Sequence, residues 1–250
     1  MEYLRNGAQL VRSQMEQALH ESLLRLQTDY IHLYQIHWPA RNINFFSKLG
    51  YQYDESESTP IEETLSVLND FVNSGKVRYI GISNETPWGV KEYLRLSEQR
   101  QWARIISIQN PYSLLNRTFE VGLAEFAHRE CVELLAYSPL GFGVLTGKYL
   151  RNINLSKARL SVFEGYTRYS NEQAKKATAA YVQLADDHGL SATQMALAYV
   201  NSRHFVAANI IGATSIQQLE ENIQSAELEL SAEVLEGIEE IHRKIPNPSP

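Results

Sequence analysis

A glycine-rich segment, VELLAYSPLGFGVLTGKY at residues 132–149, contains the residue types that bind phosphate. An apolar run leads into Tyr137-Ser138-Pro139-Leu140-Gly141, and the segment closes with Gly147-Lys148. Glycines let backbone N–H groups approach an anion closely, and a lysine adds positive charge. The segment is therefore a candidate anion-binding loop. On these residues alone, a turn that merely ends a buried strand is an equal alternative.

Two common phosphate motifs do not fit this loop. Gly143 is too close to Gly147 for a P-loop, which also needs Ser or Thr where Tyr149 stands. The dinucleotide fingerprint G-x-G-x-x-G fails because Thr146 occupies its third glycine position. The loop is therefore neither a P-loop nor a Rossmann turn.

Small polar, amide or aromatic residues follow five apolar runs of strand composition. The ends of these runs are His37-Trp38-Pro39, Ser83-Asn84, Gln109-Asn110, Tyr137-Ser138-Pro139-Leu140 and Gly212-Ala213-Thr214. One polar residue after a strand is usually a turn former or a helix cap. Five such ends together favour a functional site, because the carboxyl ends of the strands in a parallel barrel meet at one face.

Apolar periodicity predicts strands that alternate with helices. The predicted strands are Tyr30–Ile36, Val77–Ile82, Arg104–Ile108, the run from Val132 and Val206–Ile211. The predicted helices are Val11–Leu26, Ile61–Ser74, Trp88–Gln99, Phe119–Arg129, Asn171–His188, Ser191–Asn201, Ile216–Ala226 and Ser231–His242. Loops are expected at 40–60 and 150–169. This order indicates parallel βα units. No linker-like stretch divides them, so we expect a single domain over residues 1–250.

Composition excludes several classes of protein. The chain has 250 residues, of which 44% are hydrophobic and 21% charged, so it can bury a substantial core. No apolar run of about 18 residues is present, and the first residues do not have the pattern of a signal peptide. A formal net charge of −6 argues against a nucleic-acid partner. The single cysteine, Cys131, fits a reducing compartment, so we expect a cytoplasmic protein without a membrane span.

Five motifs together resemble those of the aldo-keto reductase superfamily. In chain order they are HWP, GISN, QNPYSLLNR, YSPLGFGVLTGKY and IIGATSIQQLEENI. The resemblance runs from about Ala18 to Ile238 and is nearest to the bacterial Tas-like branch, which is related to the potassium-channel β-subunits. It implies a (β/α)8 TIM barrel that binds NADP(H) across its C-terminal face and acts on a small carbonyl substrate.

The resemblance also implies which residues would hold the nicotinamide end of the cofactor. Ser83, Asn84 and Gln109 would hydrogen-bond the carboxamide, which presents both a donor and an acceptor. Tyr137 would stack on the nicotinamide ring and fix the face that delivers hydride.

The phosphates and the adenosine would be held by residues later in the chain. By motif these are Ser138, Leu140, Gly141 and Lys148 for the pyrophosphate, Arg159 near the adenosine phosphate, and Gly212, Thr214, Gln218, Glu221 and Asn222 around the adenosine. The start of the helix after the last strand suits a 2′-phosphate. Many members of the family carry arginine where Gln218 stands and lysine where Gly212 stands, so NAD stays open beside NADP. No metal-ligating residue is assigned.

The chemistry that the resemblance implies is hydride transfer to an aldehyde or ketone. In the family a tyrosine, tuned by lysine and aspartate, protonates the nascent alkoxide, and a histidine orients the carbonyl oxygen. His37 matches that histidine, with a satisfied structural histidine at a strand end as the alternative. The family's Asp, Tyr and Lys have no counterpart by motif.

The predicted strands correspond to the fourth through eighth strands of the family. We therefore expect an N-terminally truncated, incomplete barrel of about five βα units whose catalysis is impaired. The alternatives are a non-catalytic NADP-binding or regulatory protein and a non-functional remnant. Self-association is also expected, because the apolar runs Tyr30–Ile36 and Val206–Ile211 would be open sheet edges.

Overall fold

The chain folds into two compact units. The computed structural model describes residues 9–44, 46–54, 58–153, 155–163 and 165–250. The first unit consists of the described residues within 1–44, 50–109 and 125–133, and the second of those within 45–49, 110–124 and 134–250. Each unit has its own parallel strands and its own buried side chains, and each is described below by itself.

The first unit contains a parallel sheet whose strands end level with one another. Strand β1 (Ile31–Ile36) pairs with β2 (Val77–Ser83), and β2 pairs with β3 (Ile105–Gln109). The register places Ile36 beside Ile82 and Ser83 beside Gln109. The carboxyl ends of the three strands are therefore neighbours, as parallel pairing in register requires.

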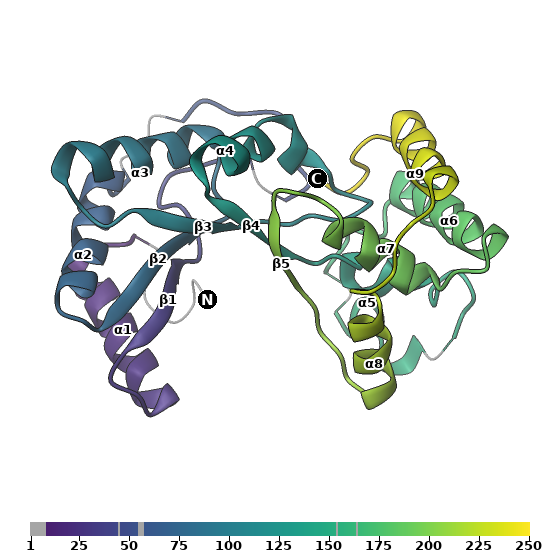
Figure 1. The fold of residues 1–250 in the computed structure, drawn as a ribbon, viewed down its shortest axis with the longest axis horizontal. Coiled ribbons are helices and arrows are strands. Elements are labelled where there is room, and N and C mark those ends of the chain that lie inside the picture. Colours follow the sequence, from purple (N-terminus) through teal and green to yellow (C-terminus); the bar gives the residue numbers. More distant parts are fainter. Residues whose placement is uncertain (1–8, 45, 55–57, 154, 164) are drawn as a thin grey trace. The chain divides into compact units, whose positions relative to one another are not determined.

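Helices α1 (Arg12–Leu26), α2 (Ile61–Asn73) and α3 (Pro87–Arg100) lie beside these strands, and α4 (Leu123–Glu130) follows β3 (Figure 1). Leu65 and Leu68 of α2 are fully buried, as is Ile80 of β2. Burial of this apolar face, rather than helix propensity, stabilises α2 against the sheet. Helix α3 starts sharply because the Thr86 hydroxyl accepts from the Gly89 N–H.

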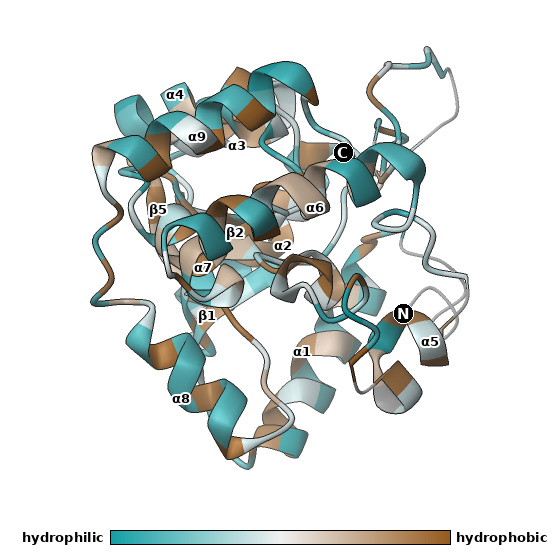
Figure 2. Cartoon of the chain, turned by 90° about the vertical axis from the view of Figure 1, so that its right-hand side faces the viewer, coloured by the Kyte–Doolittle hydropathy of each residue, from teal (hydrophilic) through white to brown (hydrophobic). Residues whose placement is uncertain are grey.

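The second unit has a parallel pair of strands and a group of helices. Strand β4 (Glu133–Tyr137) pairs with β5 (Val206–Ile210). The helices are α5 (Arg159–Val162), α6 (Glu172–Asp187), α7 (Ala192–Asn201), α8 (Ile216–Gln224) and α9 (Ala232–Lys244). Helix α6 packs on α9, and α7 packs on both α8 and β5. Hydrophobic and hydrophilic residues alternate along α8, which is amphipathic (Figure 2).

Short 3-10 helices complete the second unit, at η2 (Thr118–Val121), η3 (Gly141–Thr146) and η4 (Leu155–Lys157). Aromatic side chains fill its interior. The Phe205 ring lies 5.3 Å from that of Tyr112 and 5.4 Å from that of Phe119, measured between centroids. All three are buried. These edge-on and tilted contacts fasten the segment before α4 onto the start of β5.

The predicted order of strands and helices is confirmed, and the protein has an α/β fold with parallel strands. Two predictions are wrong in detail. The helix predicted at 119–129 is broken at Gly122 into η2 and α4, since Gly122 has a non-helical backbone. The loop predicted at 150–169 contains η4 and α5. Parts of both predicted loops (45, 55–57, 154 and 164) lie outside the described residues.

Two broader expectations are not settled by the fold. An incomplete barrel is not confirmed, and a single domain over residues 1–250 stays a prediction. Within the part of the chain that the structure describes, no helix is both long and apolar enough to cross a membrane.

Candidate active site

In the first unit, the polar residues at the strand ends are brought together by hydrogen bonds. Asn84 has a left-handed backbone (φ 56°), and its N–H donates to the Gln109 carbonyl at 3.1 Å. Its side-chain nitrogen donates to the His37 carbonyl at 2.8 Å and to the Ser83 hydroxyl at 3.2 Å. The Ser83 hydroxyl in turn donates to the Gln109 carbonyl at 2.6 Å. The sequence-predicted residues of this unit therefore form one connected cluster.

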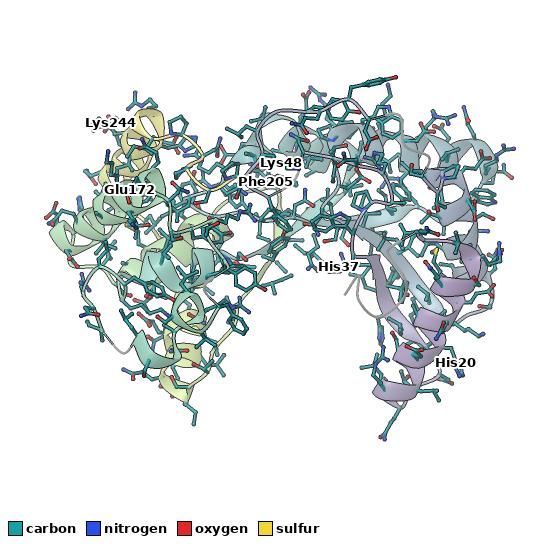
Figure 3. The ribbon with its side chains drawn as sticks, turned by 180° about the vertical axis from the view of Figure 1, so that it is seen from behind. His20, His37, Lys48, Glu172, Phe205 and Lys244 are labelled. Atoms are coloured by element: carbon teal, nitrogen blue, oxygen red, sulfur yellow. The ribbon has the colours of Figure 1, made fainter. Side chains whose placement is uncertain are left out.

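Some residues of this cluster hydrogen-bond the backbone, and others are accessible to solvent. Ser83 and Asn84 are buried, and their donors bind main-chain oxygens of neighbouring strands. His37 is exposed directly after β1 (Figure 3). Among the described residues, the side-chain amide of the half-buried Gln109 has no hydrogen-bond partner. Gln109 and His37 are therefore the groups of this cluster best placed to meet a ligand.

A buried ion pair beside this cluster was not predicted from the sequence. Glu85 is only 2% exposed, and its carboxylate accepts from both Nη atoms of Arg41. Arg41 also donates to the Thr86 hydroxyl at 3.0 Å and lies 4.9 Å over the Trp88 ring. These contacts tie the segment after β1 to the start of α3. Sequence position gives no sign that a glutamate after GISN is buried, so the pair could be found only in three dimensions.

In the second unit, Tyr137 is fixed through its main chain. Its N–H donates to the Asn110 carbonyl at 3.1 Å, and its carbonyl accepts from the Tyr112 N–H at 3.2 Å. Burial raises the pKa of the Tyr137 hydroxyl well above its usual range, and the positive charge of Arg168 opposes that rise. The phenol therefore stays protonated at neutral pH and does not act as a base there.

The turn after β4 has the backbone that its glycines predict. Gly141, Phe142 and Gly143 are consecutive left-handed residues, with φ of 53°, 57° and 86°. The Gly141 N–H donates to the Ser138 carbonyl at 2.9 Å, and the Gly143 N–H to the Leu140 carbonyl at 2.9 Å. The predicted residues Ser138, Leu140 and Gly141 therefore lie within one tight turn.

Lys148 lies against this turn and is partly withdrawn from water. A Cβ atom on Gly143 would come within 2.7 Å of the Lys148 Nζ, so the absence of a side chain there leaves room for the ammonium group. Burial lowers the pKa of Lys148. Among the described residues, no carboxylate forms an ion pair with it or shifts its pKa. A partly desolvated cation without a counter-charge is a favourable place for an anion.

Two further side chains attach to the same turn. The Arg159 guanidinium, at the start of α5, lies 4.8 Å over the Phe142 ring. The Tyr169 ring lies 4.9 Å from that of Phe142, measured between centroids. Arg159 is exposed and lies beside this turn, while its predicted place near the adenosine phosphate stays a prediction.

The predicted adenosine-binding residues gather at the start of α8. Ser215 caps this helix by accepting from the Gln218 N–H at 3.2 Å. The Gln218 side-chain oxygen accepts from the Thr214 N–H at 2.9 Å and from the Thr214 hydroxyl at 3.1 Å. The buried Asn222 amide donates to the Gly212 carbonyl at 3.4 Å. The loop between β5 and α8 is thus folded back on the first turns of the helix.

Glu221 has a clear structural partner. Its carboxylate accepts from the Ser191 hydroxyl at 2.5 Å, and its carbonyl accepts from the Gln194 side chain at 3.4 Å. These bonds connect α8 to the start of α7. Of the predicted adenosine-binding residues, Glu221 is therefore the one that also holds two helices together.

Comparison with known protein families identifies the class to which this chain belongs. The sequence model of the aldo/keto reductase family matches residues 5–243, and the chain belongs to that family of oxidoreductases. It is 52% identical over 248 residues to protein Tas of Escherichia coli (strain K12), an alignment that covers 99% of this chain and 72% of Tas.

Other relatives are more distant. An aldo-keto reductase of Babesia bovis is 36% identical over 239 residues, which cover 89% of this chain and 84% of that protein. The L-glyceraldehyde 3-phosphate reductase of Escherichia coli (strain K12) is 32% identical over 215 residues, which cover 83% of this chain and 57% of that enzyme.

These matches confirm the resemblance to the aldo-keto reductases and to Tas. The expectation of a missing N-terminal part is not supported, because the family match begins at residue 5 and extends over nearly the whole chain. The motif-based count of strands, which places the first strand of this chain fourth in the family, was the source of that expectation.

Proposed function

We propose that this protein is an NADP(H)-dependent oxidoreductase that transfers hydride between the nicotinamide and a small aldehyde or ketone. The observation that carries the proposal is Lys148, a half-buried cation against the left-handed turn at Gly143. Its donor chemistry fits the pyrophosphate of a dinucleotide, since both backbone and charge favour an anion there.

The turn after β4 and the start of α8 would supply most of the cofactor contacts. Tyr137 would stack on the nicotinamide ring, and the turn from Ser138 to Gly141 would line the pyrophosphate above Lys148. Arg159 and the start of α8 would face the adenosine and its 2′-phosphate, because a helix N-terminus favours negative charge. When bound, the nicotinamide supplies the hydride.

Residues at the ends of β1, β2 and β3 would contact the carboxamide and orient the substrate. Gln109, supported by Ser83 and Asn84, offers both a donor and an acceptor for an amide. His37 is exposed after β1, where its imidazole can donate to a carbonyl oxygen. His37 is the one residue of the chain that matches the family's catalytic tetrad, so we propose that turnover by these 250 residues is impaired.

Titration with NADPH tests this function. The purified protein should quench or shift its aromatic fluorescence saturably with NADPH, and NADH should bind roughly tenfold more weakly because it lacks the 2′-phosphate. Tyr137→Ala should weaken NADPH binding by roughly fivefold to tenfold through loss of ring stacking. Tyr79→Ala, at an exposed tyrosine of β2, is the matched control and should leave the affinity unchanged.

A flat response to NADPH in folded protein would reject the proposal. Equal affinities for NADPH and NADH would retain dinucleotide binding but reject the assignment of the 2′-phosphate site. A second candidate function is a non-catalytic NADP-binding protein, favoured by the single tetrad match at His37. It predicts the same binding without turnover.

A further inference from the structure

Two consecutive residues after β2 hold the two ends of the segment that follows β1. The Asn84 side-chain nitrogen donates to the His37 carbonyl at 2.8 Å. The carboxylate of Glu85, the next residue, accepts from both Nη atoms of Arg41, with 3.0 Å between Oε2 and Nη1. His37 and Arg41 are the first and last residues of the segment HWPAR. This segment is therefore fastened to the end of β2 at both of its ends.

The Glu85–Arg41 pair has little freedom to move. Glu85 is buried, and its Oε1 also accepts from the Thr86 N–H at 2.6 Å. The Arg41 guanidinium donates to the Thr86 hydroxyl at 3.0 Å and lies 4.9 Å over the Trp88 ring. A planar guanidinium that is hydrogen-bonded at its edge and stacked on its face is held in one orientation.

The first turn of α3 makes room for this pair. A Cβ atom on Gly89 would overlap the Glu85 carboxyl group and come within 2.6 Å of the Arg41 Nη2. Glycine is less favourable than alanine in a helix, so the helix itself gains nothing from a glycine at this position. The lack of a side chain at Gly89 is therefore explained by the pair that lies against it.

The fastened segment belongs to the cluster at the ends of β1, β2 and β3. The Asn84 N–H donates to the Gln109 carbonyl at 3.1 Å, while its side chain holds the His37 carbonyl. The three strand ends are thus joined through Asn84, and the Glu85–Arg41 pair is a further connection one residue along the chain. Groups that are already ordered lose less entropy when a ligand binds them, so this connection favours binding at the strand ends.

We propose that Glu85 and Arg41 are positioning residues that preset the cluster at the ends of β1, β2 and β3 for the nicotinamide carboxamide. This inference rests on the proposed function, because it assumes that the cluster receives that group. The pair acts through the main chain of HWPAR and through Asn84, and it does not itself contact the cofactor.

The first part of the test separates stability from positioning. Arg41→Met leaves the buried Glu85 carboxylate without its cation and should lower the urea midpoint of unfolding. Adding Glu85→Gln removes that buried charge, so the double variant should recover most of the midpoint. The double variant still lacks the ion pair, and we expect it to bind NADPH roughly fivefold to tenfold more weakly than the unmodified protein in titration calorimetry.

The second part shows which half of the cofactor loses affinity. Adenosine 2′,5′-bisphosphate lacks the nicotinamide, so the double variant should bind it as tightly as the unmodified protein does. Gly89→Ala should reproduce the selective loss for NADPH, because its Cβ displaces the Glu85 carboxylate. Arg100→Met is the matched control: Arg100 of α3 donates to Glu62 of α2 at 2.8 Å, and loss of this exposed pair should change neither affinity.

The outcomes are distinct. If the unmodified protein does not bind NADPH, the proposed function fails and this inference fails with it. If it binds NADPH and the folded double variant binds it equally well, only the positioning role is overturned. Equal weakening of both ligands would make the pair a structural one and also overturn that role. Should the double variant unfold, unchanged NADPH affinity in Gly89→Ala would overturn it.

Discussion

Several polar side chains at the strand ends already form hydrogen bonds within the protein. The Asn84 amide holds the His37 carbonyl, and the Ser83 hydroxyl holds that of Gln109. In the second unit, Lys148 differs, because among the described residues it has no carboxylate partner. A ligand would therefore gain most from Lys148 and from side chains such as Gln109 whose donors are not already committed.

The chemistry of His37 can be tested by turnover. We expect the 250-residue protein to oxidise NADPH at the background rate with a panel of aldehydes, because His37 alone supplies no tuned proton donor. The measurement is the loss of NADPH absorbance, with His37→Ala beside the unmodified protein. Turnover that disappears in His37→Ala would contradict the expected impairment.

Motif reading located these residues but not their partners. His37, Ser83, Asn84 and Gln109 each follow or end an apolar run, so local pattern was enough to find them. The Arg41–Glu85 pair could not be found this way, because burial of Glu85 depends on where Arg41 lies in space.

At the scale of elements, the start of helix α8 is capped by a serine, and the loop before it is hydrogen-bonded to the first turns of the helix. Ser215 caps the helix, while Thr214 binds the Gln218 side chain one turn later. The same helix carries exposed apolar residues at Ile216 and Ile223. Its start is therefore ordered by polar bonds rather than by burial, and removal of the cap should disturb the loop as well as the helix.

Two serine caps of the second unit allow a matched comparison. Ser215→Ala and Ser231→Ala each remove a hydroxyl that accepts from a helix N–H, in α8 and α9 respectively. Each should lower the free energy of unfolding by about 0.5–2 kcal/mol in urea titrations. Only Ser215→Ala should also weaken NADPH binding. An equal loss of NADPH affinity in both variants would contradict the proposal that the start of α8 contacts the cofactor.

Element boundaries show where local pattern is sufficient. The helices predicted at 171–188 and 191–201 match α6 and α7 closely, because each has an apolar stripe and a polar N-cap at Asn171 or Ser191. The helix predicted at 119–129 is interrupted, since a glycine at 122 lets the backbone leave the helical region. Helix α5 was missed because four residues show no periodicity.

At the scale of the whole molecule, motif order was the strongest signal in the sequence. Single motifs such as GISN are short, yet their succession with strands and helices between them predicts the family that the comparison confirms. The expectation of a missing N-terminal part came from counting strands by motif and is not supported, since the family match extends over residues 5–243.

The central claim is that the turn after β4 and the start of α8 bind NADP(H). Hydrogen–deuterium exchange with and without saturating NADPH, followed by peptide mass spectrometry, tests it most directly. We predict slower exchange in peptides that cover 137–148 and 212–222, and unchanged exchange in α1. NADPH that binds without protecting either peptide, or that protects only other segments, would contradict the account.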